Sequence, residues 1–149
     1  MVPRLLFEYG RGDIACRILT AENPRGYGDW RRQGATTTWE YWKNPRSRSH
    51  PMYGSPTVLL FEYILGIRHD GLDSGYRKVI IDPAMNTCVN SASGYITVTG
   101  GRISVSYRKE NGAVTLVASV PEGVDARVIL CGAEKEIING GEVTLTVAV

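Results

Sequence analysis

One carboxylate in this sequence stands among residue types that bind sugars. Glu40 lies between Trp39 and Trp42, two positions after a run of three threonines, and His50 follows ten residues later. Indole rings stack on the apolar faces of sugar rings, and a carboxylate without a permanent Arg partner can act as a general base. The segment therefore contains the residue types of a site that hydrolyses glycosides.

Composition alone also allows a purely structural interpretation of these residues. Trp39 and Trp42 can be core aromatics, and Glu40 can be a surface or helix-capping acid. His50 can be a hydrogen-bonded structural histidine, and His69 a linker residue. The basic residues around the aromatics are interpreted as a solvated rim of a pocket, because no glycine-rich phosphate loop accompanies them: Arg31, Arg32, Lys43, Arg46 and Arg48.

Helical segments precede and follow this region. The sequence predicts a helix that ends at Gly10, and a second helix through residues 14–19 with Asp13 as its N-cap. A further helix is predicted from Ser55, with Pro56 at its first position, to Gly66. The aromatic-rich stretch of residues 26–54 is expected to be a long structured loop, and such loops commonly carry sites.

The second part of the chain has the pattern of strands and turns. Apolar and polar residues alternate from Ile103 to Tyr107 and from Val114 to Val120, and Asn111-Gly112 between them predicts a tight hairpin. We expect five to seven short antiparallel strands packed as a β-sandwich. The fold class is therefore predicted to be α+β, with a helical part followed by an antiparallel sandwich.

The net charge and the cysteine content restrict the classes of partner. The formal net charge is +2 with 21% charged residues, so neither nucleic acid nor an anionic membrane is an expected partner. Cys16, Cys88 and Cys131 lack the spacing of a metal or redox site, so no metal or cofactor is expected, and all three are interpreted as buried free thiols. Free thiols, and the absence of a signal-like segment in these residues, favour a cytoplasmic location.

Four motifs in order resemble one enzyme family. The motifs GRGDIACRIL, GATTTWEYW, SHPMYGS and YILGIR resemble the end of the catalytic domain of family 78 α-L-rhamnosidases, and the β-rich tail resembles their C-terminal domain. The resemblance implies residues 1–70 as the last helices of an (α/α)6 barrel and residues 71–149 as a β-sandwich. It also implies Glu40 as the general base and His50 as a contact of the rhamnose. Our interpretation adds three indoles that shape the sugar pocket: Trp30, Trp39 and Trp42.

The resemblance also implies that the site is incomplete in these residues. Inverting hydrolysis needs a second carboxyl group about 6.5–9.5 Å from the base, and the family's general acid belongs to the barrel upstream. The chain alone is therefore expected to be inactive on rhamnose-containing glycans. Its helices should expose Leu59, Phe61 and Leu65, and should need the upstream barrel or self-association to cover them. The stretch between Trp42 and His50 is shorter than in many relatives.

Two other functions remain open at this stage. The chain can be a non-catalytic carbohydrate-binding or structural module in which the sandwich does the work. Alternatively it can belong to a related (α/α)6 hydrolase that acts on another sugar, because the pocket walls that select the sugar are mostly outside these residues.

Overall fold

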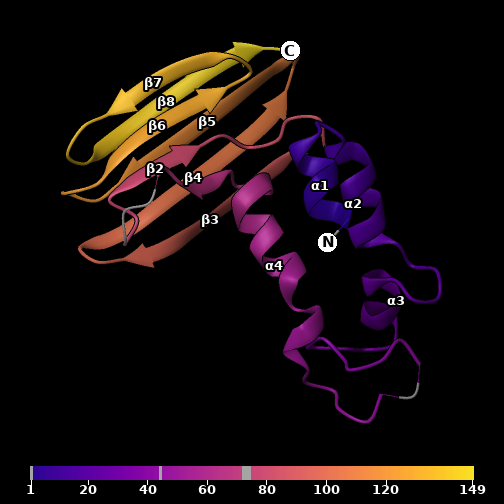
Figure 1. Cartoon of the computed structure of the whole chain (residues 1–149). Helices are drawn as coiled ribbons and strands as arrows, with labels where there is room; N and C mark the ends of the chain where they lie inside the picture. Colours follow the sequence, from indigo (N-terminus) through magenta and orange to yellow (C-terminus); the bar gives the residue numbers. More distant parts are fainter. Residues whose placement is uncertain (1, 44, 72–74) are drawn as a thin grey trace. The chain divides into compact units, whose positions relative to one another are not determined.

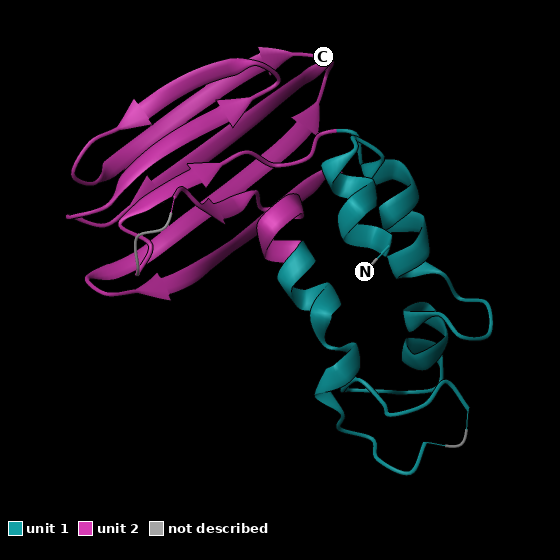
Figure 2. Cartoon of the chain, viewed as in Figure 1, with its two compact units in different colours: residues 1–59, 86–88 teal, residues 60–85, 89–149 magenta. Residues whose placement is uncertain are grey.

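The computed structural model describes residues 2–43, 45–71 and 75–149. They form two compact units (Figure 2), the first made of residues 1–59 and 86–88 and the second of residues 60–85 and 89–149. The first unit is helical and the second is built from β-strands (Figure 1). This organisation confirms the predicted α+β class, with helices first and a sandwich second.

The first unit begins with a short helical hairpin, α1 (Val2–Glu8) and α2 (Gly12–Thr20). Gly10 ends the first helix as predicted, with a φ of +69° that a residue without a Cβ adopts easily. The predicted N-cap of α2 was wrong. The helix starts at Gly12, the carbonyl of Arg11 accepts the first amides, and Asp13 lies inside the first turn, where its carboxylate pairs with Arg11 at 3.1 Å.

The rest of this unit is the long connection and the start of a helix. It contains the short helix α3 (Tyr27–Arg32), which the sequence did not reveal, and a 3-10 turn at Pro51–Tyr53. Helix α4 (Ser55–Leu59) follows. Residues 86–88 return to this unit, where the Asn86 side-chain amide donates to the carbonyl of Gly10.

The second unit starts where the helix that begins with α4 changes from α-helical to π-helical hydrogen bonding. Residues Leu60–Ile64 form a π-helical turn, closed by the Leu65 amide on the Leu60 carbonyl at 2.9 Å. Gly66 ends it at a φ of +77°, as the sequence predicted. Leu59 and Leu65 are buried and Phe61 is partly buried, so the expected exposure of these three residues was wrong. The helices and the turn after α1 instead expose other apolar residues: Val2, Leu5, Tyr9, Ile18, Val58 and Leu60.

Eight strands within the described residues form two four-stranded sheets. The first sheet has the order β1-β2-β6-β7, formed by β1 (Ile67–His69), β2 (Lys78–Ile81), β6 (Asp125–Leu130) and β7 (Ala133–Ile137). The second has the order β3-β4-β5-β8, formed by β3 (Ser91–Val98), β4 (Gly101–Glu110), β5 (Ala113–Val120) and β8 (Gly141–Ala148). All neighbouring pairs among these strands are antiparallel except β2 with β6, which is parallel.

One hydrophobic core joins the two sheets. Inward side chains of the first sheet, such as Ile81 and Val128, belong to the same buried cluster as Ile103 and Leu116 of the second. This is the packing of a β-sandwich, in which each sheet buries one face. The predicted Asn111-Gly112 hairpin is present, with φ values of +54° and +72°.

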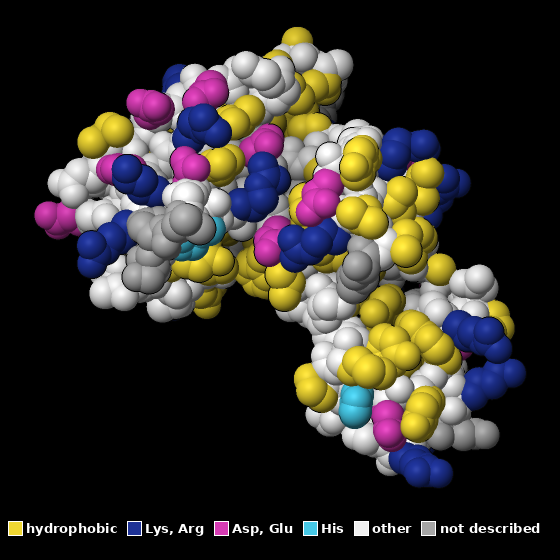
Figure 3. Space-filling view, in the orientation of Figure 1, with side chains coloured by type: hydrophobic (Ala, Val, Ile, Leu, Met, Phe, Trp, Pro, Cys, Tyr) yellow, Lys and Arg dark blue, Asp and Glu magenta, His cyan; other side chains and the backbone are white. Residues whose placement is uncertain are grey.

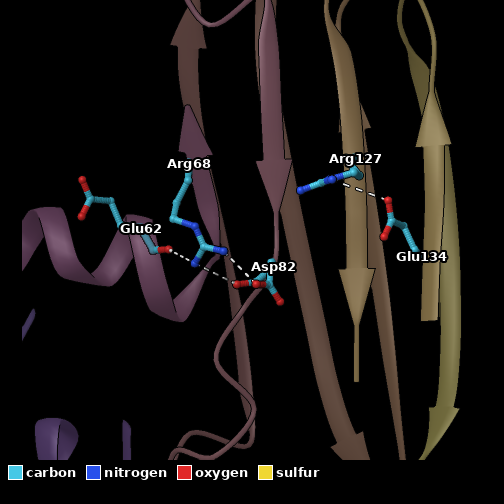
Figure 4. Close-up of polar contacts among 5 residues, drawn as sticks. All are labelled: Glu62, Arg68, Asp82, Arg127 and Glu134. Atoms are coloured by element: carbon cyan, nitrogen blue, oxygen red, sulfur yellow. Dashed lines mark hydrogen bonds and ion pairs between the residues drawn. The ribbon is translucent and has the colours of Figure 1, made fainter. Parts of the chain in front are cut away.

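Polar contacts of two kinds occur on the first sheet (Figure 4). The guanidinium of Arg68 contacts the Asp82 carboxylate at 2.7 Å and lies 3.5 Å from the carbonyl oxygen of Glu62. It thus links β1 both to the end of β2 and to the preceding helical turn. Arg127 and Glu134 form a looser, more exposed pair at 3.6 Å.

The three cysteines are free thiols. Cys16 is buried as expected, but Cys88 and Cys131 are exposed, so their predicted burial was wrong. Cys131 occupies the turn between β6 and β7 at a φ of +48°, beside Gly132, and a turn at the edge of a sheet faces solvent.

Candidate functional site

The residues singled out by the sequence lie in the first unit, on the connection between α3 and α4. Helix α3 is stabilised at its end by Asp29, whose carboxylate accepts bonds from Arg32 at 2.6 Å and from Gln33 at 2.9 Å. The chain then turns at Gly34, with a φ of +83°, and the Ala35 amide donates to the Trp30 carbonyl at 3.0 Å. These contacts set where the threonine run begins.

Two segments of the connection are held side by side by hydrogen bonds, and we call this arrangement the Thr37–His50 clamp. The His50 amide donates to the Thr38 carbonyl at 2.8 Å, and the Thr38 hydroxyl donates to the His50 carbonyl at 2.7 Å. The Thr37 hydroxyl donates to the carbonyl of Arg48. The Glu40 amide donates to the Ser47 carbonyl at 3.0 Å. The clamp therefore brings Glu40 and His50 onto one paired element.

Glu40 is half-buried on this clamp. One of its carboxylate oxygens accepts the Ser47 amide at 3.3 Å. Among the described residues, no Lys or Arg forms an ion pair with it. A carboxylate held by a single backbone amide keeps lone pairs available to accept a proton, as a general base must.

His50 is held by its backbone. Both its amide and its carbonyl are bonded to Thr38, while no bond to its ring is recorded within the described part of the chain. The ring is half-buried and can donate or accept. His69 lies in the other unit, on β1, against the ring of Tyr76 at 4.9 Å.

The three tryptophans form one aromatic cluster with two tyrosines. Trp30 stacks on Trp42 with ring centroids 4.3 Å apart, and Trp39 lies 5.9 Å from Trp30. Tyr27 and Tyr53 meet the same rings edge-on or tilted. Trp30 and Trp39 are only 2% and 6% exposed, whereas Trp42 is half-buried. Trp42 therefore has the most indole surface left for a ligand, and the other two support it.

A wide, shallow cavity of about 510 Å³, largely open to solvent, lies beside this cluster. Its wall combines α3, the threonine run and the start of α4: Tyr27, Trp30, Arg31, Ala35, Thr36, Thr37, Thr38, Gly54 and Thr57. Glu40 and His50 are not part of this wall, although Thr38 belongs to both the wall and the clamp. Glu40 therefore follows the threonines of the cavity wall along the chain, but it does not itself line the cavity.

Metal ligands do not gather in the described residues. No group of three or more His, Cys, Asp or Glu side chains is close enough to hold an ion in residues 2–43, 45–71 and 75–149. In the same residues, no helix is both long and apolar enough to cross a membrane.

Comparison with protein families divides the chain at the end of the helical part. Residues 1–64 match the bacterial α-L-rhamnosidase 6-hairpin glycosidase domain, and residues 66–145 match the bacterial α-L-rhamnosidase C-terminal domain. The chain belongs to the bacterial α-L-rhamnosidases. The boundary between the two matched domains, at residues 64–66, lies close to the division between the two compact units at residues 59 and 60.

Curated relatives are rhamnosidases much longer than this chain. An α-L-rhamnosidase of Formosa agariphila is 28% identical over 145 residues, which cover 91% of this chain and 15% of the relative. One from an Alteromonas species is 30% identical over 143 residues, which cover 87% and 15%. The chain therefore spans about one-seventh of the length of these rhamnosidases.

Solved rhamnosidase structures contain the same fold. The Streptomyces avermitilis α-L-rhamnosidase complexed with L-rhamnose matches with a TM-score of 0.85 and 27% identity, over 97% of this chain and 17% of that protein. The α-L-rhamnosidase of Aspergillus terreus matches with a TM-score of 0.85 at 24% identity, over 97% and 18%, which is a likeness in fold. The family resemblance drawn from the four motifs is confirmed.

Sequence reasoning missed the residues that build the clamp and the cluster. Tyr27 and Tyr53 complete the aromatic cluster, and Ser47 and Thr38 hold Glu40 and His50. The run of three threonines was a usable signal, since hydroxyls near an extended backbone commonly bond to carbonyls or amides. Which carbonyl each threonine reaches depends on a contact twelve residues away.

Proposed function

We propose that this chain supplies the general base of an inverting glycoside hydrolase that releases terminal α-L-rhamnose. The chain is a rhamnosidase segment by family, and its Glu40 carries the single observation on which the proposal rests. That observation is a half-buried carboxylate that accepts one backbone amide and has no ion-pair partner among the described residues. Such a group can remove a proton from water as the water attacks the anomeric carbon.

The other site residues take supporting roles in this proposal. The His50 ring bonds a hydroxyl of the rhamnose, and Trp42 stacks on the sugar face. Trp30 and Trp39 hold Trp42 in place through the aromatic cluster. The general acid belongs to the part of the barrel upstream, so the chain alone does not turn over rhamnosides.

We also propose that the helices need a partner. Apolar side chains on α1, α2 and α4 and in the turn after α1 are exposed, among them Leu5 at 52%, Tyr9 at 82% and Val58 at 47%. The upstream barrel of the same enzyme is the partner we favour, and self-association of the isolated chain is the alternative. We propose that the barrel segment stops and the sandwich begins in the stretch from Ile64, the last helical residue, to residue 70.

The test is substitution of Glu40 in a longer rhamnosidase that contains this segment. Glu40→Gln keeps the size of the side chain and removes its basicity, so turnover of an aryl α-L-rhamnoside should fall about a thousand-fold or more. Glu22→Gln, an exposed acid of the same unit, is the matched control and should leave turnover unchanged. Near-normal turnover by Glu40→Gln would refute the assignment.

A second function has one observation in its favour. The outer face of the β3-β4-β5-β8 sheet bears a hollow of about 560 Å³, whose wall includes the hydroxyls of Ser91, Ser93, Ser106 and Thr115. Hydroxyl groups can form hydrogen bonds with a sugar, so the sandwich is the alternative location of a sugar-binding function. The NMR resonances of these residues should shift saturably when the chain is titrated with L-rhamnose. Unchanged resonances would rule this function out.

A further inference from the structure

Two Asn-Gly turns of the second unit have the same backbone conformation and different surroundings. Asn111-Gly112 joins β4 to β5, and Asn139-Gly140 joins β7 to β8. Asn111 has a φ of +54° and Asn139 a φ of +55°, and each is followed by a glycine of positive φ. Strand β8 runs from one turn to the other, so they lie at opposite ends of the sheet (Figure 1). The pair therefore separates the effect of the surroundings from that of the dipeptide itself.

An Asn-Gly dipeptide can lose its side-chain amide without an enzyme. The amide nitrogen of the glycine gives up its proton and attacks Cγ of the asparagine, which closes a five-membered succinimide ring and releases Nδ2 as ammonia. Water then opens the ring at either of its two carbonyls. One opening leaves aspartate, and the other leaves isoaspartate, in which the main chain runs through Cβ. Glycine favours the attack because it has no Cβ to restrict the approach of its nitrogen.

Three hydrogen bonds hold the Asn139-Gly140 turn. The Asn139 amide donates to the Asp125 carboxylate at 2.9 Å, and the Asn139 side-chain oxygen accepts the Gly123 amide at 3.1 Å. The Gly140 amide, whose nitrogen is the nucleophile, donates to the Val124 carbonyl at 2.9 Å. Both reacting groups of this turn are therefore already bound to other parts of the chain.

The reacting groups of the Asn111-Gly112 turn are not held in this way. The Gly112 carbonyl accepts the Val149 amide at 2.8 Å, but the Gly112 amide and the Asn111 side chain have no hydrogen-bond partner among the described residues. Both Asn111 and Asn139 are exposed, and charged side chains of both signs lie over the visible face of the second unit in Figure 3. Water therefore reaches either turn, and the two turns differ in the hydrogen bonding of their reacting groups.

We infer that Asn111 is a site of spontaneous deamidation to aspartate and isoaspartate, and that the fold protects Asn139 from the same reaction. Each asparagine must leave its left-handed conformation before the glycine nitrogen can reach Cγ, so the rate follows the population of the locally opened turn. Opening the turn at Asn139 breaks three hydrogen bonds, and opening the turn at Asn111 breaks one. Two additional bonds of ordinary strength make Asn139 roughly thirty-fold slower.

The product changes the hairpin between β4 and β5. Glu110 and Ala113 pair on either side of the turn, and a tight type I′ turn requires two residues between them. Isoaspartate lengthens this loop by one main-chain atom, because Cβ enters the backbone. Either product also places a second carboxylate beside Glu110. The reaction therefore loosens and charges this end of the sandwich, and it does not depend on the proposed role of Glu40.

The test is a timed incubation of the complete 149-residue chain at neutral pH, followed by trypsin digestion and mass spectrometry. Cleavage after Lys109, Arg127 and Lys135 leaves each asparagine alone in its own peptide, residues 110–127 and residues 136–149. Deamidation is read from the mass gain of an acid over an amide, and isoaspartate from its separate elution. In the folded chain Asn111 should convert roughly thirty-fold faster than Asn139, and in urea the two rates should become similar.

A substitution at Asp125 tests the cause of the protection. Asp125→Ala removes one of the three bonds at Asn139, so deamidation of Asn139 should become about five-fold faster. Glu136→Ala, which changes an exposed acid of β7 outside the turn, is the matched control. The rate at Asn111 should be the same in both variants.

Three results would overturn the inference. The first is an intact Asn111 in the folded chain over the time in which it converts in urea. The second is equal deamidation of Asn111 and Asn139 in the folded chain, and the third is an unchanged rate at Asn139 in Asp125→Ala. These measurements require no turnover, so their failure would leave the role of Glu40 intact.

Discussion

The hydroxyl of Thr38 donates to the carbonyl of His50 at 2.7 Å, and the amide of His50 donates back to the carbonyl of Thr38 at 2.8 Å. This reciprocal pair sets the register of the clamp that also carries Glu40. A threonine at this position thus controls where the proposed base and the proposed sugar-binding histidine lie relative to each other.

Removal of the Thr38 hydroxyl should loosen this register. Thr38→Val keeps the shape and loses one hydrogen bond worth about 1 kcal/mol, so the His50 amide should exchange with solvent roughly five-fold faster. Thr38→Ser retains the hydroxyl and should restore the slow rate. Thr57→Val is the control, because Thr57 lines the cavity beside α3 and its side chain forms no hydrogen bond with another described residue. Equal exchange rates in Thr38→Val and the parent chain would show that the hydroxyl does not hold the clamp.

The turn at Gly66 should tolerate no side chain. Its φ is +77°, and a Cβ there would lie 2.2 Å from the backbone nitrogen of Pro83. Gly66→Ala should lower the free energy of unfolding by roughly 3 kcal/mol or more. Gly132→Ala has a similar φ of +85° and open space, so it should cost about 1 kcal/mol. Urea unfolding followed by far-UV circular dichroism measures both, and similar losses would contradict the predicted clash.

Arg68 and Arg127 each form an ion pair on the first sheet, so variants of the two residues can be compared. Arg68→Met should lower the free energy of unfolding by about 1–2 kcal/mol, because this guanidinium also contacts the Glu62 and Asp82 carbonyls. Arg127→Met should cost no more than about 0.5 kcal/mol, since its pair is exposed and 3.6 Å long. Urea titrations of both variants would show the ranking, and a larger loss in Arg127→Met would reverse it.

The contact between Arg11 and Asp13 gives a pH dependence with a definite sign. The hydrogen bond from Arg11 holds the pKa of the Asp13 carboxyl below its ordinary value. A carboxyl whose pKa is lower in the folded state stabilises the fold above its unfolded pKa and loses this contribution as the pH falls through the folded value. Asp13→Asn should therefore lower the melting temperature at about pH 7, and this difference should shrink as the pH falls below the ordinary range of an aspartate. A gap that widens in acid would have the wrong sign.

The sequence predicted the parts of the fold that depend on local patterns. Strands β4 and β5 alternate apolar and polar residues around Asn111-Gly112, and the structure pairs them as that pattern requires. Strand β7 was missed because Glu134, Lys135 and Glu136 are all exposed on an edge strand and show no alternation. The parallel pairing of β2 with β6 joins residues far apart in sequence, which no local pattern can reveal.

The candidate site, like the fold, could be predicted from the sequence only where local patterns define it. The residue types around Glu40 pointed to sugar chemistry, and four ordered motifs pointed to the rhamnosidases. The clamp depends on bonds between segments about ten residues apart, so the roles of Thr38 and Ser47 became visible only with the structure. Helix α3 was missed because six residues containing a glycine are too few to show a helical period.

Azide rescue of a Glu40→Ala variant of the longer enzyme tests the central claim most directly. Azide needs no base, and it can occupy the space of the missing carboxylate and attack the anomeric carbon from the side where water would stand. The account predicts recovery of aryl α-L-rhamnoside cleavage with azide and formation of β-L-rhamnosyl azide. A folded variant that gains nothing from azide, or that yields the α-configured product, would contradict a base role for Glu40.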